Sequence, residues 1–172
     1  MSLNIPDWEI EVDSDVEAPW TKTGNDWEAI ARIAARASHN VAPELENARL
    51  NASVLFTSDK NVHALNLEWR NRDKPTNVLS FPMLERDELL DLTPDGPPEM
   101  LGDIALAFET CQREANEKGI SLADHTTHLL IHGFLHLAGH DHVDSDEQAA
   151  AMEKLEIEAL AILGIADPYG DR

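Results

Sequence analysis

The segment HGFLHLAGHDH, residues 132–142, concentrates side chains that bind metal ions. Three of its histidines, His132, His136 and His142, follow the spacing H-x3-H-x5-H. Residues four apart lie on the same face of a helix, so the first two imidazoles can share one ion. Gly139 can adopt a positive φ and end the helix, which lets the chain turn back and present His142 as a third ligand. Three protein nitrogens with an open fourth position are typical of a catalytic zinc site.

The alternative for this segment is a histidine-rich surface helix that binds no metal. It is disfavoured because six of the eight histidines lie between His125 and His142, three of them at a known ligand spacing. Zinc is the first choice of ion because imidazole suits it, although nickel, copper and iron also accept histidine. His125 and His128 extend the same helix face, and we expect them to line the cleft or orient the ligands. Asp141 is expected to orient a histidine or the bound water, or to cap the turn.

Gly133 separates this segment from the metzincin proteases, which share the spacing H-E-x-x-H-x-x-G-x-x-H but carry a general-base glutamate at this position. A metal ion on three neutral histidines lowers the pKa of its bound water towards roughly 7, so hydroxide is available without a strong general base. A peptide bond also needs a proton for its poor amine leaving group, whereas a phosphodiester needs charge neutralised on its oxygens. Gly133 therefore favours a phosphodiesterase over a protease, and we expect it to leave space for a bulky strand beside the metal.

A second group of chemically active side chains lies in LNLEWRNRDKPTNVLSFP, residues 65–82. Arg70, Arg72 and Lys74 follow a predicted helix and precede a predicted strand. Arginine binds phosphate with two parallel hydrogen bonds and stabilises charge on a phosphoryl transition state. The alternative is a solvated basic turn whose cations pair with neighbouring acids.

The whole chain is acidic, with a formal net charge of −20 over 172 residues. This charge disfavours non-specific binding to polyanions, so we expect weak intrinsic affinity for RNA, steep salt dependence and no DNA partner. The length favours a single domain over residues 1–172. The single cysteine, Cys111, excludes an internal disulfide framework and is expected to be an ordinary core or surface thiol. With no signal peptide and no apolar run of membrane-spanning length, we expect a cytoplasmic protein that contacts no membrane.

The elements that must position these groups are expected in the order β-α-β-α-β-β-α-α-α. Strands are predicted at about residues 8–12, 49–57, 77–84 and 101–108, and helices at about 26–38, 59–70, 109–119, 121–139 and 145–163. The acidic, proline-rich residues 85–100 are predicted to form a loop. In the last helix, Glu153, Glu156 and Glu158 are expected mostly on the outside. This pattern predicts an α/β (α+β) fold with a mixed sheet of about four strands and about five packed helices.

The two motif segments together resemble the YbeY family, the bacterial rRNA-maturation endoribonucleases. HGFLHLAGHDH is similar to that family's H-G-x-L-H-L-x-G-[aromatic]-D-H, and LNLEWRNRDKPTNVLSFP to its L-N-x-x-[aromatic]-R-x-x-D-K-P-T-D-V-L-S-F-P. Lesser similarities are LGDIALAF (101–108), the pair His125 and His128, and a closing ADPYG (166–170). The similarity runs from about residue 50 to residue 170.

The resemblance implies that His132, His136 and His142 bind one zinc ion. It also implies that RNA cleavage depends on Arg70 and His136. The implied function is that of a single-strand-specific metallo-endoribonuclease, acting in maturation of the 16S rRNA 3′ end and in ribosome quality control. A ribosomal protein or an assembly GTPase fits as the partner that recruits it.

Two residues depart from the family pattern. His140 stands where the family usually has tyrosine, and could add a titrating group or a competing ligand beside the metal. Asn77 stands where it usually has aspartate, which would remove a hydrogen-bond acceptor near Arg70.

Two other functions stay open for the same histidines. One is a metal-dependent hydrolase of another class, a peptidase or an amidohydrolase. The other is a non-catalytic ribosome-assembly factor with a structural zinc, whose fourth ligand would be His128, His140 or Asp141.

Overall fold

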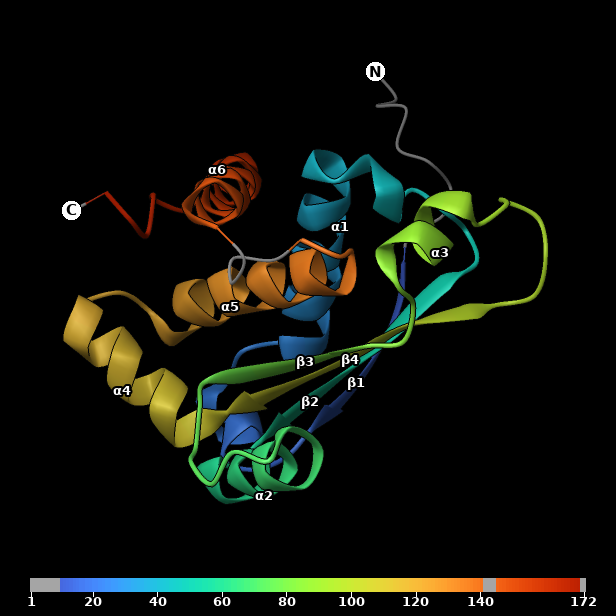
Figure 1. Ribbon diagram of the computed structural model, residues 1–172. Coiled ribbons are helices and arrows are strands. Elements are labelled where there is room, and N and C mark those ends of the chain that lie inside the picture. Colours follow the sequence, from blue (N-terminus) through green and yellow to red (C-terminus); the bar gives the residue numbers. More distant parts are fainter. Residues whose placement is uncertain (1–9, 141–144, 171–172) are drawn as a thin grey trace.

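One four-stranded sheet organises the chain, which a computed structural model describes at residues 10–140 and 145–170. The strands are β1 (Glu11–Val16), β2 (Leu50–Thr57), β3 (Val78–Pro82) and β4 (Glu99–Ala107), and they lie in the order β1-β2-β4-β3. β1, β2 and β4 are parallel, whereas β3 pairs antiparallel with β4 and forms an edge (Figure 1). The predicted mixed sheet with packed helices is therefore confirmed.

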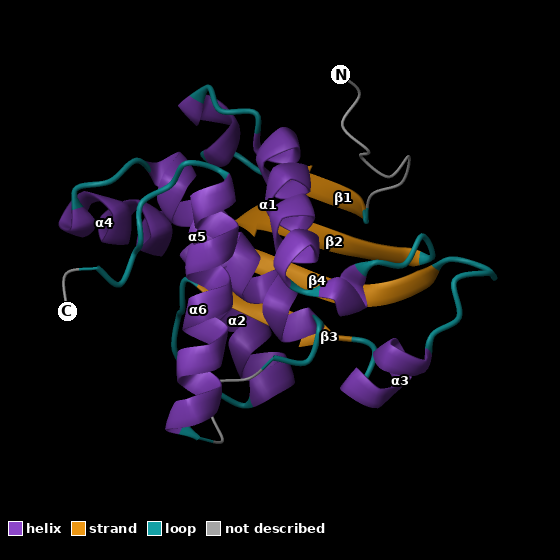
Figure 2. Cartoon of the chain, turned by 90° about the horizontal axis from the view of Figure 1, so that it is seen from above, coloured by secondary structure: helices purple, strands orange, loops and turns teal. Residues whose placement is uncertain are grey.

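The helices cover the two faces of the sheet unequally. They are α1 (Trp27–Val41), α2 (Asp59–Arg70), α3 (Arg86–Asp91), α4 (Phe108–Lys118), α5 (Leu122–Leu137) and α6 (Asp146–Ile162), with short 3-10 helices at Trp20–Thr23 and Pro43–Leu45. α1, α5 and α6 lie over one face, and α2 lies on the other (Figures 1 and 2). A large apolar cluster containing Trp27, Phe56 and Phe134 fills the first layer, and a small cluster around Val62 and Leu79 fills the second. None of the helices in the described part is long and apolar enough to span a bilayer.

Short polar side chains begin the principal helices, as the sequence predicts. The side chains of Asp26, Ser58, Ser121 and Ser145 each accept a hydrogen bond from the backbone N–H three residues later, at 3.0 to 3.2 Å. Gly119, with φ at 68°, ends α4 in the left-handed conformation. These caps fix where α5 and α6 begin, and those two helices carry most of the candidate site.

The expected loop at residues 85–100 is wrong in its first half, because α3 occupies Arg86–Asp91. The backbone N–H of Glu85 donates to the Glu88 carboxylate at 3.0 Å, and Leu89 is buried in the main core. The described residues thus contain six α-helices, against about five expected. The first strand also lies later than predicted, at Glu11–Val16, where it can pair along β2; residues 8 and 9 of the prediction lie outside the described part.

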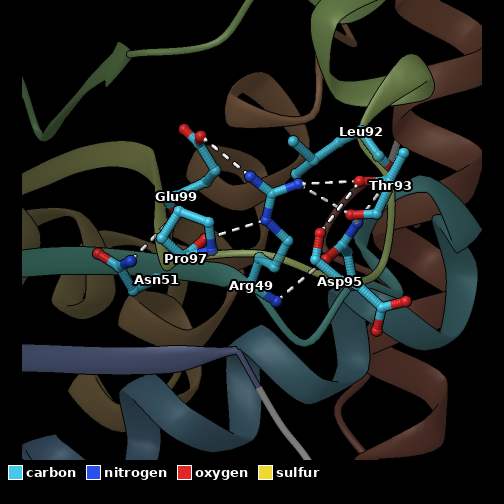
Figure 3. Close-up of polar contacts among 8 residues, drawn as sticks. Arg49, Asn51, Leu92, Thr93, Asp95, Pro97 and Glu99 are labelled. Atoms are coloured by element: carbon cyan, nitrogen blue, oxygen red, sulfur yellow. Dashed lines mark hydrogen bonds and ion pairs between the residues drawn. The ribbon is translucent and has the colours of Figure 1, made fainter.

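Arg49 holds the rest of the loop that follows α3. Its guanidinium donates to the carbonyl oxygens of Thr93 and Pro97 at 3.0 and 2.9 Å, and contacts the Glu99 carboxylate at 3.3 Å (Figure 3). One side chain immediately before β2 therefore ties this loop to the start of β4.

Twelve of the sixteen residues of α5 are buried, because the helix is covered by α1 and α6 and rests on the sheet. At Gly133 the backbone approaches β4 so closely that a Cβ atom would lie 2.9 Å from the Ile104 side chain. Gly133 also lines an open cleft, so the expectation that this glycine leaves space for a bulky strand beside the metal stays a prediction. Its missing side chain lets the histidine-bearing helix pack against the sheet.

Candidate active site

A cleft of about 1600 Å³ lies between the edge strand β3 and the exposed flank of α5. Arg70, from the last turn of α2, lines it together with His132 and His136 of α5. The two motifs that the sequence singles out, far apart along the chain, therefore line one cleft. Figure 1 shows β3 running beside α5, which is the arrangement that brings the motifs together.

His132 and His136 face each other on consecutive turns of α5. Their Nε2 atoms are 3.0 Å apart, and the ring centroids are 4.5 Å apart. Two nitrogen lone pairs at this separation repel unless a proton or a cation lies between them. Two histidine nitrogens on one tetrahedral zinc ion, each about 2.0–2.1 Å from it, are about 3.3 Å apart. The pair therefore fits a shared metal ion.

Glu156 of α6 lies behind this pair and is 1% exposed. Its Oε1 atom is 3.2 Å from His132 Nδ1, 2.7 Å from His128 Nε2 and 3.1 Å from the Tyr169 hydroxyl. Burial alone would raise the pKa of this carboxyl, but the hydrogen bonds and charges of His128 and His132 together outweigh burial and lower the pKa to about 2. The expectation that Glu156 lies outside is wrong. It follows the buried Met152 by four residues and precedes the buried Leu160 by four, a spacing that could have revealed its orientation.

A second carboxylate–histidine pair lies at the α4 end of the cleft. Glu114 Oε1 is 2.9 Å from His125 Nε2 and accepts a hydrogen bond from Asn77 Nδ2 at 2.9 Å. Burial lowers the pKa of His125, which favours the neutral ring. Asn77 also accepts from the backbone N–H of Val78 at 2.7 Å. The side chain of Asn77 therefore bonds to Glu114 and to the backbone of Val78, whereas Arg70 bonds to Ser80. The expected loss of a hydrogen-bond acceptor near Arg70 is thus not seen in these contacts. His125 and His128 both line the cleft, as expected.

The turn after α5 is held from two sides. Gly139 has φ at 93°, as predicted, and the Arg86 guanidinium donates to the carbonyl oxygen of Ala138 at 2.8 Å. His140 Nε2 contacts the Glu44 carboxylate, which lies 3.3 Å from Arg86. His140 thus pairs with a carboxylate beside the cleft. The sequence around Glu44 contains no motif that would have predicted this pairing.

Arg70 is anchored at the open edge of β3. Its guanidinium donates to the backbone carbonyl of Ser80 and lies 5.4 Å from the centroid of the Phe81 ring. The basic turn beyond it is shaped by the buried Asn66, whose side chain donates to the Lys74 carbonyl at 2.8 Å. Asn66 also accepts the Arg72 N–H through its backbone at 3.1 Å.

The charge of the cleft differs from that of the whole chain. Among residues 10–140 and 145–170, five cations line it, namely Arg70, Arg72, Lys74, Arg86 and Lys118, against three carboxylates at Glu85, Glu88 and Glu114. The full chain has 13 cations and 33 acids. The cleft is thus a basic strip on an acidic body, suited to a polyanionic chain.

The third predicted ligand, His142, lies outside the described residues, as does Asp141. Within residues 10–140 and 145–170, no group of three histidine, cysteine or acidic side chains is arranged to hold a metal. His132 and His136 are nevertheless arranged as two ligands of one ion, and Gly139 turns the chain immediately before the segment with His142. The ligand set His132, His136 and His142 stays a prediction, as does the role of Arg70.

Comparison with known proteins assigns the family. A family model described as Endoribonuclease YbeY matches residues 16–164. An Endoribonuclease YbeY of Erythrobacter litoralis is 72% identical over 147 residues, covering 86% of this chain and 91% of that protein. One from Novosphingobium aromaticivorans is 54% identical over 159 residues, covering 92% and 95%. The solution structure of a Thermotoga maritima protein has a similar fold, with a TM-score of 0.54 and 21% identity over 92% of this chain and 98% of that one. From the family match and these relatives, the chain belongs to the endoribonuclease YbeY family.

Proposed function

We propose that this protein is a zinc-dependent endoribonuclease that cleaves single-stranded RNA, acting on the 3′ end of the 16S rRNA precursor and in ribosome quality control. The observation that carries the proposal is the shared cleft, in which an anchored arginine and a facing histidine pair lie along a basic strip. The names of the relatives, Endoribonuclease YbeY, support RNA as the substrate class.

His132, His136 and His142 would hold the ion. When bound, zinc supplies Lewis-acid polarisation of a phosphoryl oxygen and lowers the pKa of water. The chain itself supplies Arg70. Its guanidinium has five N–H donors, and one bond to Ser80 leaves others for the scissile phosphate. Arg72 and Lys74 are placed along the same cleft to guide the RNA backbone.

The close packing at Gly133 supports a nuclease over a peptidase. A glutamate at this position would have to displace Ile104 of the sheet before it could approach the ion. A general base at the position where the metzincin proteases have theirs would thus require the Ile104 side chain or α5 to shift. A phosphodiester makes less demand on such a base, because neutralising charge on its oxygens is the larger requirement.

The cytoplasm is the proposed location, and a ribosomal protein or an assembly GTPase is the proposed recruiting partner. Recruitment would offset the weak affinity expected from a net charge of −20.

The test is cleavage of a labelled 16S 3′-end precursor by the zinc-loaded protein. His136→Ala removes one proposed ligand, and Arg70→Ala removes the proposed phosphate contact. We expect both variants to lose cleavage, by about 100-fold or more for a lost contact to transition-state charge. Arg70→Lys should recover little activity, because a lysine cannot form the paired hydrogen bonds of arginine.

Arg113→Ala is the matched control, because Arg113 is an exposed arginine of α4 outside the cleft lining. It should cleave like the wild type. Equal cleavage by all variants would mean a contaminating nuclease. Peptide hydrolysis lost in His136→Ala but kept in Arg70→Ala would favour the hydrolase alternative.

A further inference from the structure

The carboxylate of Glu156 is placed where ordinary packing would favour an apolar side chain. Glu156 lies between the buried residues Met152 and Leu160 along α6, and it is 1% exposed. Burying a carboxylate carries a desolvation cost that a leucine of similar volume would avoid. The desolvation cost of this carboxylate therefore arises at a position that faces the histidines of α5.

One oxygen of this carboxylate gathers three hydrogen-bonding groups. His132 Nδ1 and His128 Nε2 come from α5, at 3.2 and 2.7 Å, and the Tyr169 hydroxyl comes from the C-terminal segment, at 3.1 Å. The Tyr169 ring also packs edge-on against His128, with centroids 5.5 Å apart. The backbone N–H of Tyr169 is bound to the Asp167 side chain at 2.7 Å. The carboxylate is thus held in place by α5 and by the end of the chain.

The contact with His132 decides which of its nitrogens carries the proton. A carboxylate oxygen accepts, so His132 Nδ1 donates to it and Nε2 keeps its lone pair. That Nε2 atom is the one that lies 3.0 Å from His136 Nε2. A carboxylate behind a histidine ligand fixes the orientation and tautomer of the ring and strengthens it as a metal ligand.

We propose that Glu156 is a positioning residue, which holds the His132 ring and its protonated Nδ1 so that Nε2 is presented beside His136. The proposal rests on the proposed function in taking His132 as a zinc ligand. The described contacts of Glu156 are with His128, His132 and Tyr169, so it would act through His132.

The experiment compares Glu156→Leu, Glu156→Gln and the wild type in two measurements. The first is zinc affinity, from competition with a chromophoric chelator. The second is the His132 tautomer in zinc-free protein, from the ¹⁵N shifts of its imidazole. Leucine removes the acceptor, whereas glutamine keeps a weaker neutral one. Loss of such a carboxylate typically lowers metal affinity by about 10- to 100-fold. We therefore expect a decrease of this size in the zinc affinity of Glu156→Leu and a smaller decrease in that of Glu156→Gln. The Nδ1–H tautomer should decline in the same order.

The unfolding transition of each zinc-free variant separates positioning from a merely structural role. Replacing a buried charge by a well-packed apolar residue is often neutral or stabilising. A Glu156→Leu protein that is as stable as the wild type but binds zinc weakly supports positioning. If the leucine variant does not fold, Glu156→Gln carries the same comparison. Glu158→Gln, with the same charge change at an exposed position of α6, should leave both measurements unchanged.

Unchanged zinc affinity and an unchanged His132 tautomer in both Glu156 variants would overturn the proposal. Failure of the proposed function has a different result. A wild-type protein that binds no zinc, or that binds zinc and cleaves no RNA, removes that function. The tautomer measurement on zinc-free protein still decides whether Glu156 positions His132.

Discussion

Glu44 shows how single residues near the cleft are held in one ionisation state. Its side chain is 8% exposed and contacts His140 and Arg86. Burial is the largest single influence and opposes ionisation, but the hydrogen bonds from His140, the backbone and Arg86, together with the charge of His140, outweigh it and lower the pKa of Glu44 to about 2, from an ordinary value of 4.5. The departure at His140 is therefore matched by a carboxylate more than ninety residues away in the sequence.

The depressed pKa of Glu44 predicts a pH-dependent stability. A carboxyl whose pKa is lower in the folded protein stabilises the fold above its unfolded pKa. That stabilisation is lost as the pH falls from about 4.5 towards 2. Near pH 5 the free energy of unfolding of the wild type should thus exceed that of Glu44→Gln, and the difference should shrink as the pH falls below 4.5. Chemical denaturation across this range measures it.

Glu46→Gln, an exposed glutamate two residues later, controls for the loss of one charge. If the difference for Glu44→Gln did not change with pH, Glu44 would not be held ionised by its neighbours.

Cys111 provides a second prediction at the residue scale. It is fully buried, and burial together with the charges of Glu114 and Asp59 raises the pKa of its thiol. Because the thiolate is the reactive form, the folded protein should react very slowly with iodoacetamide at neutral pH. Mass spectrometry after timed labelling measures this. Protein unfolded in guanidinium should label readily, and rapid labelling of the folded protein would contradict the assignment of Cys111 to the core.

At the scale of elements, helix ends were predictable because they depend on residues close together in sequence. Ser121 and Gly119 mark the start of α5 and the end of α4 through contacts within a few positions. α3 was missed because its one buried residue, Leu89, gains its burial from distant segments. Glu156 was placed on the wrong side of α6 because carboxylates usually face solvent, although Met152 and Leu160, four positions to either side, mark the buried face of the helix.

The turn that follows α5 yields a prediction about Gly139. A residue with a side chain pays about 1–2 kcal/mol for a left-handed conformation. At Gly139 a Cβ atom would also lie 2.7 Å from the Arg86 side chain. Gly139→Ala should therefore lower the free energy of unfolding by more than the conformational cost alone.

Gly119→Ala is the matched comparison, because Gly119 has φ at 68° and its added Cβ would meet nothing within 4 Å. Thermal unfolding of both variants isolates the contact with Arg86. Equal destabilisation would mean that Arg86 moves aside freely and does not hold the turn.

For the whole molecule, the sequence showed the overall acidity but not where the few cations gather. Lys118 of α4 and Arg86 of α3 join Arg70, Arg72 and Lys74 only because the fold brings these elements to one cleft. An acidic body with a basic cleft should bind RNA through few phosphate contacts while the remainder of its surface repels the strand. Affinity for RNA should therefore be weak, and its fall with rising salt should be set by the number of phosphates that the cleft cations neutralise.

The contribution of Lys74 to this binding can be counted from the salt dependence. Each phosphate neutralised on a single strand contributes about 0.7 to the slope of log affinity against log salt concentration. In a His136→Ala background, which prevents cleavage during the titration, Lys74→Gln should weaken binding and reduce that slope by about 0.7. Lys60→Gln removes the same charge from α2 outside the cleft lining and should leave the slope unchanged. If Lys74→Gln and Lys60→Gln reduced the slope equally, RNA binding would depend only on the net charge of the protein. The cleft would then not be the RNA-binding site.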